Sequence, residues 1–178
     1  ADVFSAEFAA DADTYAWANV LPRANDTALL GWHFEKEVSW SKMDLRYWLN
    51  PTVFAEGSPG RAAAIGFVKA RYNNGIKRLN SAWGCRAASF DALSDCVSPA
   101  AHRWQCQRSG DTGWPPGVDS AQLTSDSEAF ILVFAKKYFD VVTQAIRRYD
   151  TNHLLFGMRG GCFGSHSMLS LFSSYIDV

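Results

Sequence analysis

The chain has 178 residues and a formal net charge of −1, and 48% of its residues are apolar, with aromatic residues at 14%. This composition is that of an ordinary globular protein of domain size, and it excludes a disordered, collagen-like or coiled-coil chain. The balanced charge gives no basic surface for nucleic acid, and no apolar run approaches the roughly 20 residues of a membrane span. We therefore expect neither nucleic acid nor a membrane as a partner.

The first predicted helix runs from Ser5 to about Val20, because Ser5 can cap an Ala-rich stretch, and Pro22 closes it. The apolar run Ala28–Phe34 is short and bounded by turn signals, which favours a buried strand. Gly31 inside this run predicts that another backbone approaches it closely.

Residues 41–57 are mixed in character and are predicted to form a loop. Ser58-Pro59 then signals a helix start, with Ser58 as the cap and Pro59 at the first helical position, and this helix reaches Tyr72. Asn73-Asn74-Gly75 ends it. Two further short helical pieces are predicted at Ile76–Trp83 and Ser89–Leu93.

The four cysteines form no C-x-x-C pair, which disfavours a zinc site, and we expect no cofactor or metal. Three of them lie in an irregular stretch at about residues 84–122, where a disulfide would pin the loop if the protein is secreted. The sequence chooses neither among the pairings nor between a disulfide and free buried thiols in a cytosolic protein. The four are Cys85, Cys96, Cys106 and Cys162.

The strongest helical periodicity spans Ser127–Tyr149, and the turn at Asp150–Asn152 follows it. His153–Met158 is predicted as a second buried strand, Ser167–Ser173 as a short helix, and Tyr175–Val178 as the start of a third strand. Apolar strands separated by helices indicate βαβ units, and therefore an α/β fold with a parallel sheet. In such folds the chemistry lies at the carboxyl ends of the strands.

Two carboxylates, Glu35 and Glu37, follow the first predicted strand and stand between Trp32 and Trp40. Desolvation by indole rings raises the pKa of a carboxyl group and keeps a proton available for donation, which suits acid/base chemistry on a sugar. Indole faces also stack on sugar rings. The alternative interpretation is a solvated acidic turn.

The stretch Leu30–Trp40 resembles the fourth-strand motif of β-agarase-like and β-galactosidase-like glycoside hydrolases of the retaining (β/α)8 clan. That motif is a Gly-aromatic strand ending in Asp-Asn-Glu, then an apolar residue, Ser and Trp. The resemblance implies a partial (β/α)8 TIM barrel, about strands four to six with their helices. It makes residues 1–178 part of a single catalytic domain with the cysteine-containing insertion at about 84–122. Further similar pieces follow in order at Ser58-Pro59, Leu79–Gly84, Tyr138-Phe139, Asn152–Leu154, Gly157–Arg159 and Tyr175–Val178.

The resemblance also implies that Glu37 is the general acid/base, which protonates the leaving oxygen and then activates water. The implied nucleophile is a second Glu after the seventh strand, whereas this chain stops at the sixth. Glu35 lies on the same wall as Glu37 and does not fill that role. Lys36 stands where the family has an Asn that binds the sugar 2-hydroxyl. A nearby ammonium lowers the pKa of Glu37, so Lys36 fits either an anionic substrate or a loss of activity.

The predicted substrate-binding residues are Trp32, Lys36, Trp40 and Arg159. For Arg159 the alternative is a structural role, in which it pairs with a carboxylate at the barrel mouth.

The resemblance implies a retaining glycosidase, secreted or extracellular, that acts on a galactan-like polysaccharide or oligosaccharide. The alternatives are a non-catalytic, carbohydrate-binding pseudoenzyme and an unrelated α/β domain. A complete barrel needs about 250 residues. We therefore expect the isolated chain to be inactive, and unstable because two strand edges stay open.

Overall fold

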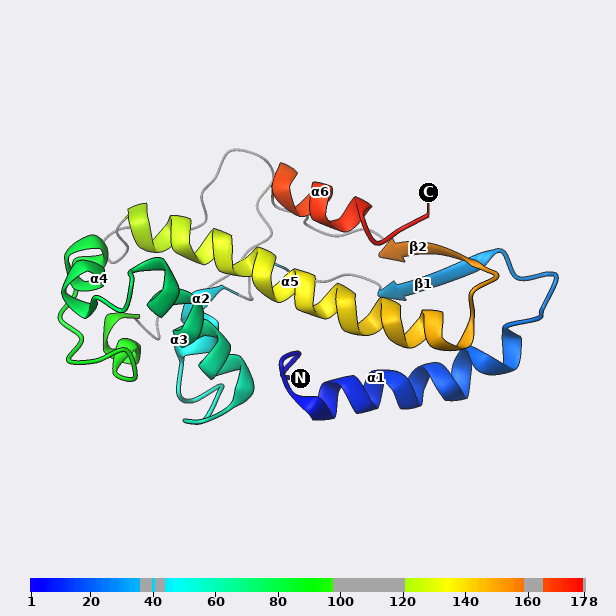
Figure 1. Cartoon of the computed structure of the whole chain (residues 1–178), viewed down its shortest axis with the longest axis horizontal. Coiled ribbons are helices and arrows are strands. Elements are labelled where there is room, and N and C mark those ends of the chain that lie inside the picture. The colour runs from blue at the N-terminus through cyan, green and yellow to red at the C-terminus, as the bar shows by residue number, and fades with distance from the viewer. Residues whose placement is uncertain (36–39, 41–43, 98–120, 159–164, 178) are drawn as a thin grey trace. The chain divides into compact units, whose positions relative to one another are not determined.

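The computed structural model describes residues 1–35, 40, 44–97, 121–158 and 165–177 (Figure 1). The chain divides into two compact units. The first, here called the strand unit, combines Ala1–Trp40 with Leu132–Val178. The second, here called the helical unit, is Ser41–Ile131. The long helix α5, Ala121–Tyr149, begins in the helical unit and ends in the strand unit.

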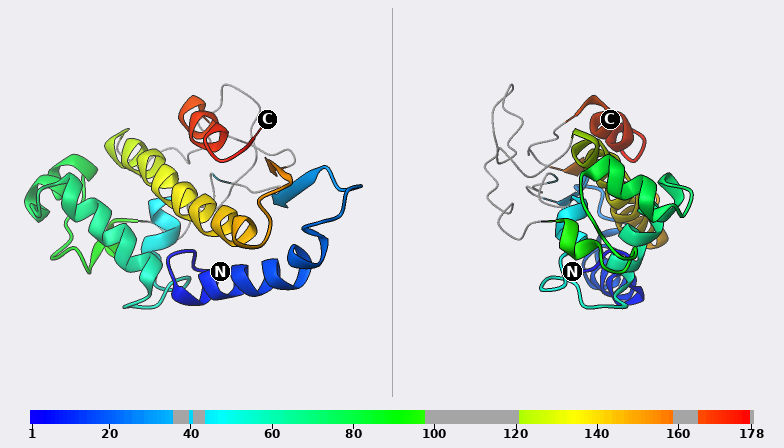
Figure 2. Two further views of the ribbon diagram at one scale, coloured as in Figure 1. Left: turned by 45° about the vertical axis from the view of Figure 1, so that its right-hand side comes forward. Right: turned by 90° about the vertical axis from the view of Figure 1, so that its left-hand side faces the viewer.

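The strand unit contains a two-stranded parallel sheet whose strands are joined through α5. Gly31 pairs with Leu154 and Glu35 pairs with Met158, so the strands β1 and β2 start and end at the same levels. Figure 2 shows the two strands side by side in the turned view. The predicted parallel β-helix-β order is confirmed for these two strands. The elements of the unit are α1 (Ala6–Asn19), a 3-10 turn (Leu21–Arg23), β1 (Gly31–Glu35), the end of α5, β2 (Leu154–Met158) and α6 (His166–Ser173).

Local signals explain where these elements begin. Ser5 Oγ accepts the Phe8 amide at 3.0 Å, so the predicted cap of α1 is confirmed. Gly31 is needed because a Cβ there would lie 2.3 Å from the Leu154 carbonyl oxygen, and this close backbone approach is the one expected. Asn73 and Asn74 adopt positive φ angles after α3 (Pro59–Arg71), so the predicted stop is also confirmed.

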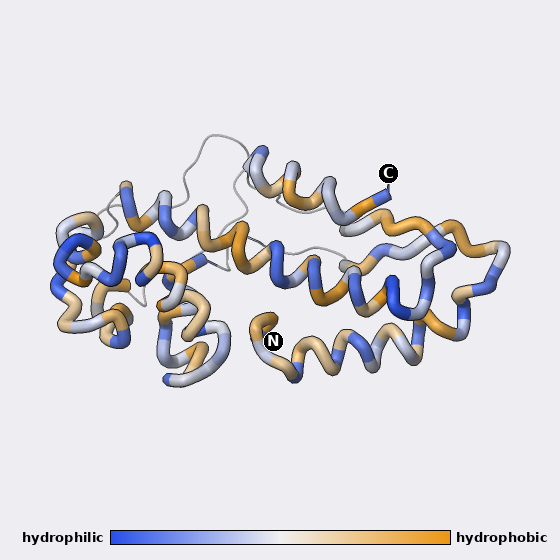
Figure 3. Tube along the Cα trace, in the orientation of Figure 1, coloured by the Kyte–Doolittle hydropathy of each residue, from blue (hydrophilic) through white to orange (hydrophobic). Residues whose placement is uncertain are grey.

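The core of the strand unit lies between the sheet and its helices. Hydrophobic and polar segments alternate along α5 in Figure 3, as expected for a helix with one buried face. Trp32 and Phe34, which alternate along β1, both pack against this core from the same side of the strand. Its buried residues are Ala16, Val20, Ala145, Ile146 and Leu155.

The predicted third strand is wrong for the described residues Tyr175–Asp177, which form no strand. The Asp177 amide donates to the Leu155 carbonyl at 3.0 Å, as a strand residue would. The Leu155 amide, however, donates to the Asp177 side chain at 2.6 Å. The same carboxylate also pairs with Arg147. A side chain therefore occupies the position that a backbone carbonyl would take in a ladder.

In the helical unit, several elements begin at residues other than those predicted from the sequence. Residues 41–57, predicted as a loop, contain the short helix α2 (Leu45–Leu49), because Asp44 Oδ1 accepts the Arg46 and Tyr47 amides. Ser58 is the N-cap residue of α3 and Pro59 its first helical residue, as predicted, but the buried Ser58 hydroxyl has no hydrogen-bond partner among the described residues. The helix predicted at Ser127 starts earlier, at Ala121. Helix α4 (Ile76–Trp83) matches its prediction.

One disulfide, Cys85–Cys96, closes the loop after α4, with 5.5 Å between the two Cα atoms. The turn predicted at Ser89–Leu93 is replaced by a 3-10 turn at Leu93–Cys96. Cys106 and Cys162 lie outside the described residues. Among the helices that the structure describes, none has the length and apolar character to cross a membrane.

Candidate active site

The carboxyl ends of β1 and β2 lie at one edge of the sheet, because Glu35 and Met158 are partners in the parallel register. In the sequence, Lys36 and Glu37 follow the end of β1 directly, and Arg159 follows the end of β2. These three predicted site residues lie outside the described residues. The structure shows that the two strands these residues follow end at the same level of the sheet.

Trp32 lies near the start of β1, away from its carboxyl end. Its indole Nε1–H donates to Asp150 Oδ2 at 2.7 Å, and its ring packs against the core of the strand unit. The indole thus has a structural partner on the helix-covered side of the strand. Its predicted contact with a sugar stays a prediction.

Trp40 is 2% exposed and packs against three rings of α5, with centroid distances of 5.6 Å to Phe134, 5.7 Å to Tyr138 and 5.2 Å to Phe139. Its Nε1–H has no hydrogen-bond partner among the described residues. A ring buried in this way presents no open face to a sugar in the described conformation. Its substrate-binding role also stays a prediction.

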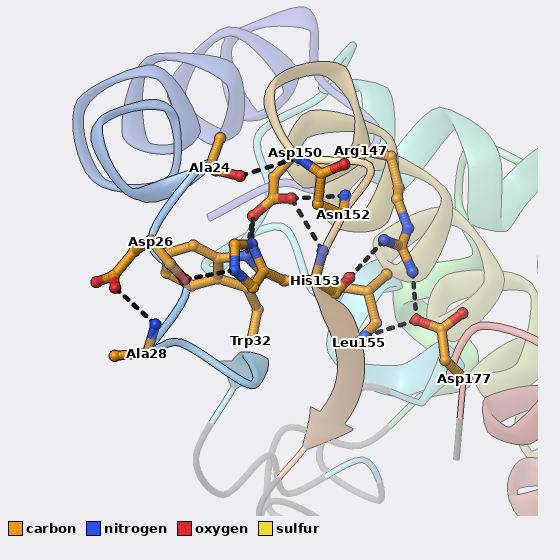
Figure 4. Close-up of polar contacts among 10 residues, drawn as sticks. All are labelled: Ala24, Asp26, Ala28, Trp32, Arg147, Asp150, Asn152, His153, Leu155 and Asp177. Atoms are coloured by element: carbon orange, nitrogen blue, oxygen red, sulfur yellow. Dashed lines mark hydrogen bonds and ion pairs between the residues drawn. The ribbon is translucent and has the colours of Figure 1, made fainter.

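A polar network that the sequence analysis missed lies at the amino ends of the two strands (Figure 4). The Asp150 carboxylate, buried in the turn between α5 and β2, accepts the indole of Trp32 and lies 2.7 Å from Nδ1 of His153. Its other oxygen accepts the backbone amides of Asn152 and His153, at 2.9 and 3.1 Å. The signal that could have revealed it is an Asp directly after a helix with a His three residues later, the pattern of a carboxylate that closes its own turn.

The charge states in this network follow from its contacts. Burial acts to raise the pKa of Asp150, but the hydrogen bonds from Trp32, Asn152 and His153 outweigh it and hold that pKa below its usual range. The hydrogen bond to Asp150, followed by that to the Asp26 carbonyl, raises the pKa of His153. The network is therefore a carboxylate facing an imidazole that favours its protonated form.

A second carboxylate, Asp126, is fully buried in the helical unit. It accepts hydrogen bonds from Arg71 and Tyr72 at 2.5 Å and from Trp83 and Gln122 at 2.8 Å. Burial acts to raise its pKa, and these four donors together lower it. For Tyr72, burial and the bond to this carboxylate raise the pKa to about 12. Because every contact is internal, Asp126 joins α3, α4 and α5 rather than facing a ligand.

Two hollows are described. One of about 560 Å³ lies in the strand unit between α1, β1 and α5, and its lining includes Phe8, Tyr15, Phe34 and Tyr138. The other, of about 420 Å³, lies in the helical unit beside α3. Within the described residues, no group of three or more His, Cys, Asp or Glu side chains is placed to hold a metal ion.

Comparison with known proteins gives one consistent answer. The chain is 29% identical to β-agarase A of Vibrio sp. (strain JT0107) over 191 aligned residues, which cover 99% of this chain and 17% of the relative. No family model matches.

Solved structures agree with this result. An exo-β-agarase is 25% identical, with a TM-score of 0.74 over 99% of this chain and 22% of its own. The agarase AgWH50C is 22% identical, with a TM-score of 0.73 over 99% of this chain and 24% of its own. The chain therefore resembles β-agarases in sequence and in fold along nearly its whole length, and it spans about a sixth of the curated relative's length.

Proposed function

We propose that this chain forms part of a retaining glycoside hydrolase that cleaves an agar-like galactan, and that Glu37 is its general acid/base. The observation that carries this proposal is the likeness to β-agarases over 99% of the chain, including the stretch around Glu37. We propose a galactan substrate because those relatives are agarases. Strands β1 and β2 would be the fourth and fifth strands of a (β/α)8 barrel.

The alternation of side chains along β1 supports a position of Glu37 on the side of the strand that the helices do not cover. Trp32 and Phe34 pack toward the helices, and His33, between them, is exposed and lies 5.3 Å from the Phe156 ring. Alternate residues of a strand share a face. The pairing with β2 shifts on both sides of His33, so parity is counted along β1 itself. Glu37 has the parity of His33, and a regular extended continuation of β1 would turn it away from the helix-packed side, toward a barrel interior.

Glu37 would act in both halves of a double displacement. As an acid it protonates the leaving oxygen while a nucleophile from elsewhere in the barrel attacks the anomeric carbon. As a base it then removes a proton from the water that releases the sugar. Lys36 and Arg159, which follow the two strand ends, would bind polar or anionic substituents of the galactan.

The test is Glu37→Ala in the longest soluble form of the protein, assayed on agar oligosaccharides. We expect kcat to fall by about 10²–10⁴-fold. Azide should restore turnover of a substrate with a good leaving group and yield a glycosyl azide of retained configuration. Glu35→Gln is the matched control, since it removes a neighbouring carboxylate and should keep most of the activity. Unchanged hydrolysis by the Glu37 variant would contradict the assignment.

A second candidate function rests on Lys36, which replaces the family's Asn beside the acid/base. It is a carbohydrate-binding pseudoenzyme whose site holds a sugar without cleaving it. Calorimetric binding of oligosaccharides with no product in a long incubation would favour this candidate over the hydrolase.

We also propose that the protein is secreted. The Cys85–Cys96 disulfide supports this location, because such bonds persist in oxidising compartments. The isolated chain should lack hydrolytic activity, since no residue in it matches the nucleophile position.

A further inference from the structure

His153 has an acceptor at each ring nitrogen. Nδ1 lies 2.7 Å from Asp150 Oδ2, and Nε2 lies 3.0 Å from the backbone carbonyl of Asp26. A carbonyl oxygen cannot donate, and Asp150 is a carboxylate because its pKa is lowered. Neutral imidazole carries one N–H and satisfies only one of these acceptors. The imidazolium carries two and satisfies both.

We propose that protonated His153 is a pH-dependent pin that holds the loop between α1 and β1 against the turn between α5 and β2. Two regions far apart in sequence meet at this ring: Asp26 and Trp32 come from the loop and the start of β1, and Asp150 comes from the turn before β2. Asn152 adds a neighbouring tie through its side-chain amide, which donates to the Ala24 carbonyl at 3.0 Å. Figure 4 shows these contacts converging beside the start of β2.

The charged groups around the ring come from each element packed against it. From the loop comes Asp26, whose carboxylate accepts the Ala28 amide at 3.0 Å. From the turn comes Asp150, and from α5 comes Arg147, which donates to the backbone carbonyl of His153 at 2.7 Å. Two acidic residues thus stand near the imidazole, while the guanidinium is engaged by the carbonyl and by Asp177. This balance favours the cation.

Deprotonation has a defined first consequence. The charged Asp150 retains the proton on Nδ1, since a hydrogen bond to a carboxylate is stronger than one to a carbonyl. Nε2 then has no proton and becomes an acceptor, and it faces the backbone carbonyl oxygen of Asp26, which is also an acceptor. The loop contact is therefore the one that is lost.

The sign of the pH effect follows from the raised pKa of His153. A raised folded-state pKa contributes stability that is fully present below the ordinary value of about 6.5. That contribution disappears as the pH rises through the folded-state pKa.

The direct test is an NMR titration of the whole chain that follows the imidazole carbon and nitrogen resonances of its four histidines. His153→Asn assigns the signal by its loss. We expect the His153 resonance to titrate above pH 6.5, with protons on both ring nitrogens below the midpoint and on Nδ1 alone above it. A midpoint at or below 6.5, or an Nε2–H that persists in the neutral form, would overturn the proposal.

Thermal unfolding between pH 5 and pH 9 gives a second readout. Asn at 153 can still donate toward Asp150 but cannot reach Asp26, so the Tm advantage of the wild type over His153→Asn should be largest at low pH and shrink as the pH rises. His166→Asn, an exposed position at the start of α6, is the matched control and should follow the wild-type profile. A Tm difference independent of pH would refute a protonation-dependent pin. If His153→Asn does not fold, variants of the other three histidines assign the His153 signal by elimination, and the wild-type titration decides.

Discussion

At the scale of single residues, two buried carboxylates join elements that lie far apart in the sequence. Asp150 ties β1 to the α5–β2 turn, and Asp126 ties α3 and α4 to α5. For Asp150 the sequence offers only the local Asp-x-x-His pattern after a helix, and for Asp126 it offers no comparable pattern. The long-range partner of Asp150 lies 118 positions away and those of Asp126 lie 43 to 55 positions away, beyond the reach of a local pattern.

Tyr72→Phe tests the Asp126 cluster. The hydroxyl donates to a buried carboxylate at 2.5 Å, so its loss should destabilise the chain by about 1.5–3 kcal/mol. Urea unfolding at pH 7 measures this change. Tyr15→Phe, which removes a hydroxyl from an exposed ring of α1, is the control and should change the stability little. Equal effects of the two variants would contradict the role of the cluster.

Asp126 also predicts an acid effect with a definite sign. Because its folded-state pKa is lowered, its contribution is present above the ordinary carboxyl value of about 3.9 and is lost as the pH falls through the folded-state pKa. Acid titrations followed by circular dichroism should therefore show Asp126→Asn unfolding with a weaker dependence on pH below 4 than the wild type. An identical acid dependence would show that another group controls this transition.

At the scale of elements, the sequence predicted most of what has a strong local signal. The cap of α1, the bounds of α4, the two parallel strands and the Asn73-Asn74 stop were all readable from residue type and period. Helix α2 was missed because five residues are too short to show a helical period, and its start depends on the buried Asp44–Arg46 pair. The third strand was wrong because the Leu155 amide donates to the Asp177 side chain, where a strand would offer a backbone carbonyl.

Gly157 in β2 occupies a position that has no room for a side chain. Its φ is +78°, and a Cβ would lie 2.3 Å from the Phe172 ring of α6. We expect Gly157→Ala to cost about 2–5 kcal/mol from the sum of backbone strain and overpacking. Gly57→Ala is the matched control, since its φ is +80° and nothing lies within 4 Å. It should cost only about 1–2 kcal/mol, and equal midpoints in urea would refute the crowding at α6.

At the scale of the whole molecule, the sequence predicted where the candidate site residues stand relative to the strands, but not which of their side chains are exposed. Sequence order put Glu37 after one strand and Arg159 after the other, and the register shows that these strands end at one level. Trp32 and Trp40 looked like sugar platforms because they flank the acidic pair. The structure packs both rings against internal partners, since exposure depends on three-dimensional neighbours that a linear motif does not contain.

The disulfide makes a prediction for the chain as a whole. Closing a loop between residues 85 and 96 should stabilise the fold by about 2–4 kcal/mol. Adding a reductant should therefore lower the Tm. A double Cys85→Ser, Cys96→Ser variant should start at the lower value and stay there when reductant is added. If that variant still responds to reductant, the loss must come from another cysteine.

The contact between Asp177 and Leu155 has a consequence for association between molecules. The amide of Leu155 would otherwise be an open donor on the rim of a two-stranded parallel sheet, where a foreign strand could begin to pair. A carboxylate already fills that position, and Arg147 neutralises its charge. An incoming strand could pair with this amide only by displacing an ion-paired carboxylate, which makes edge-to-edge association at this position of β2 less favourable.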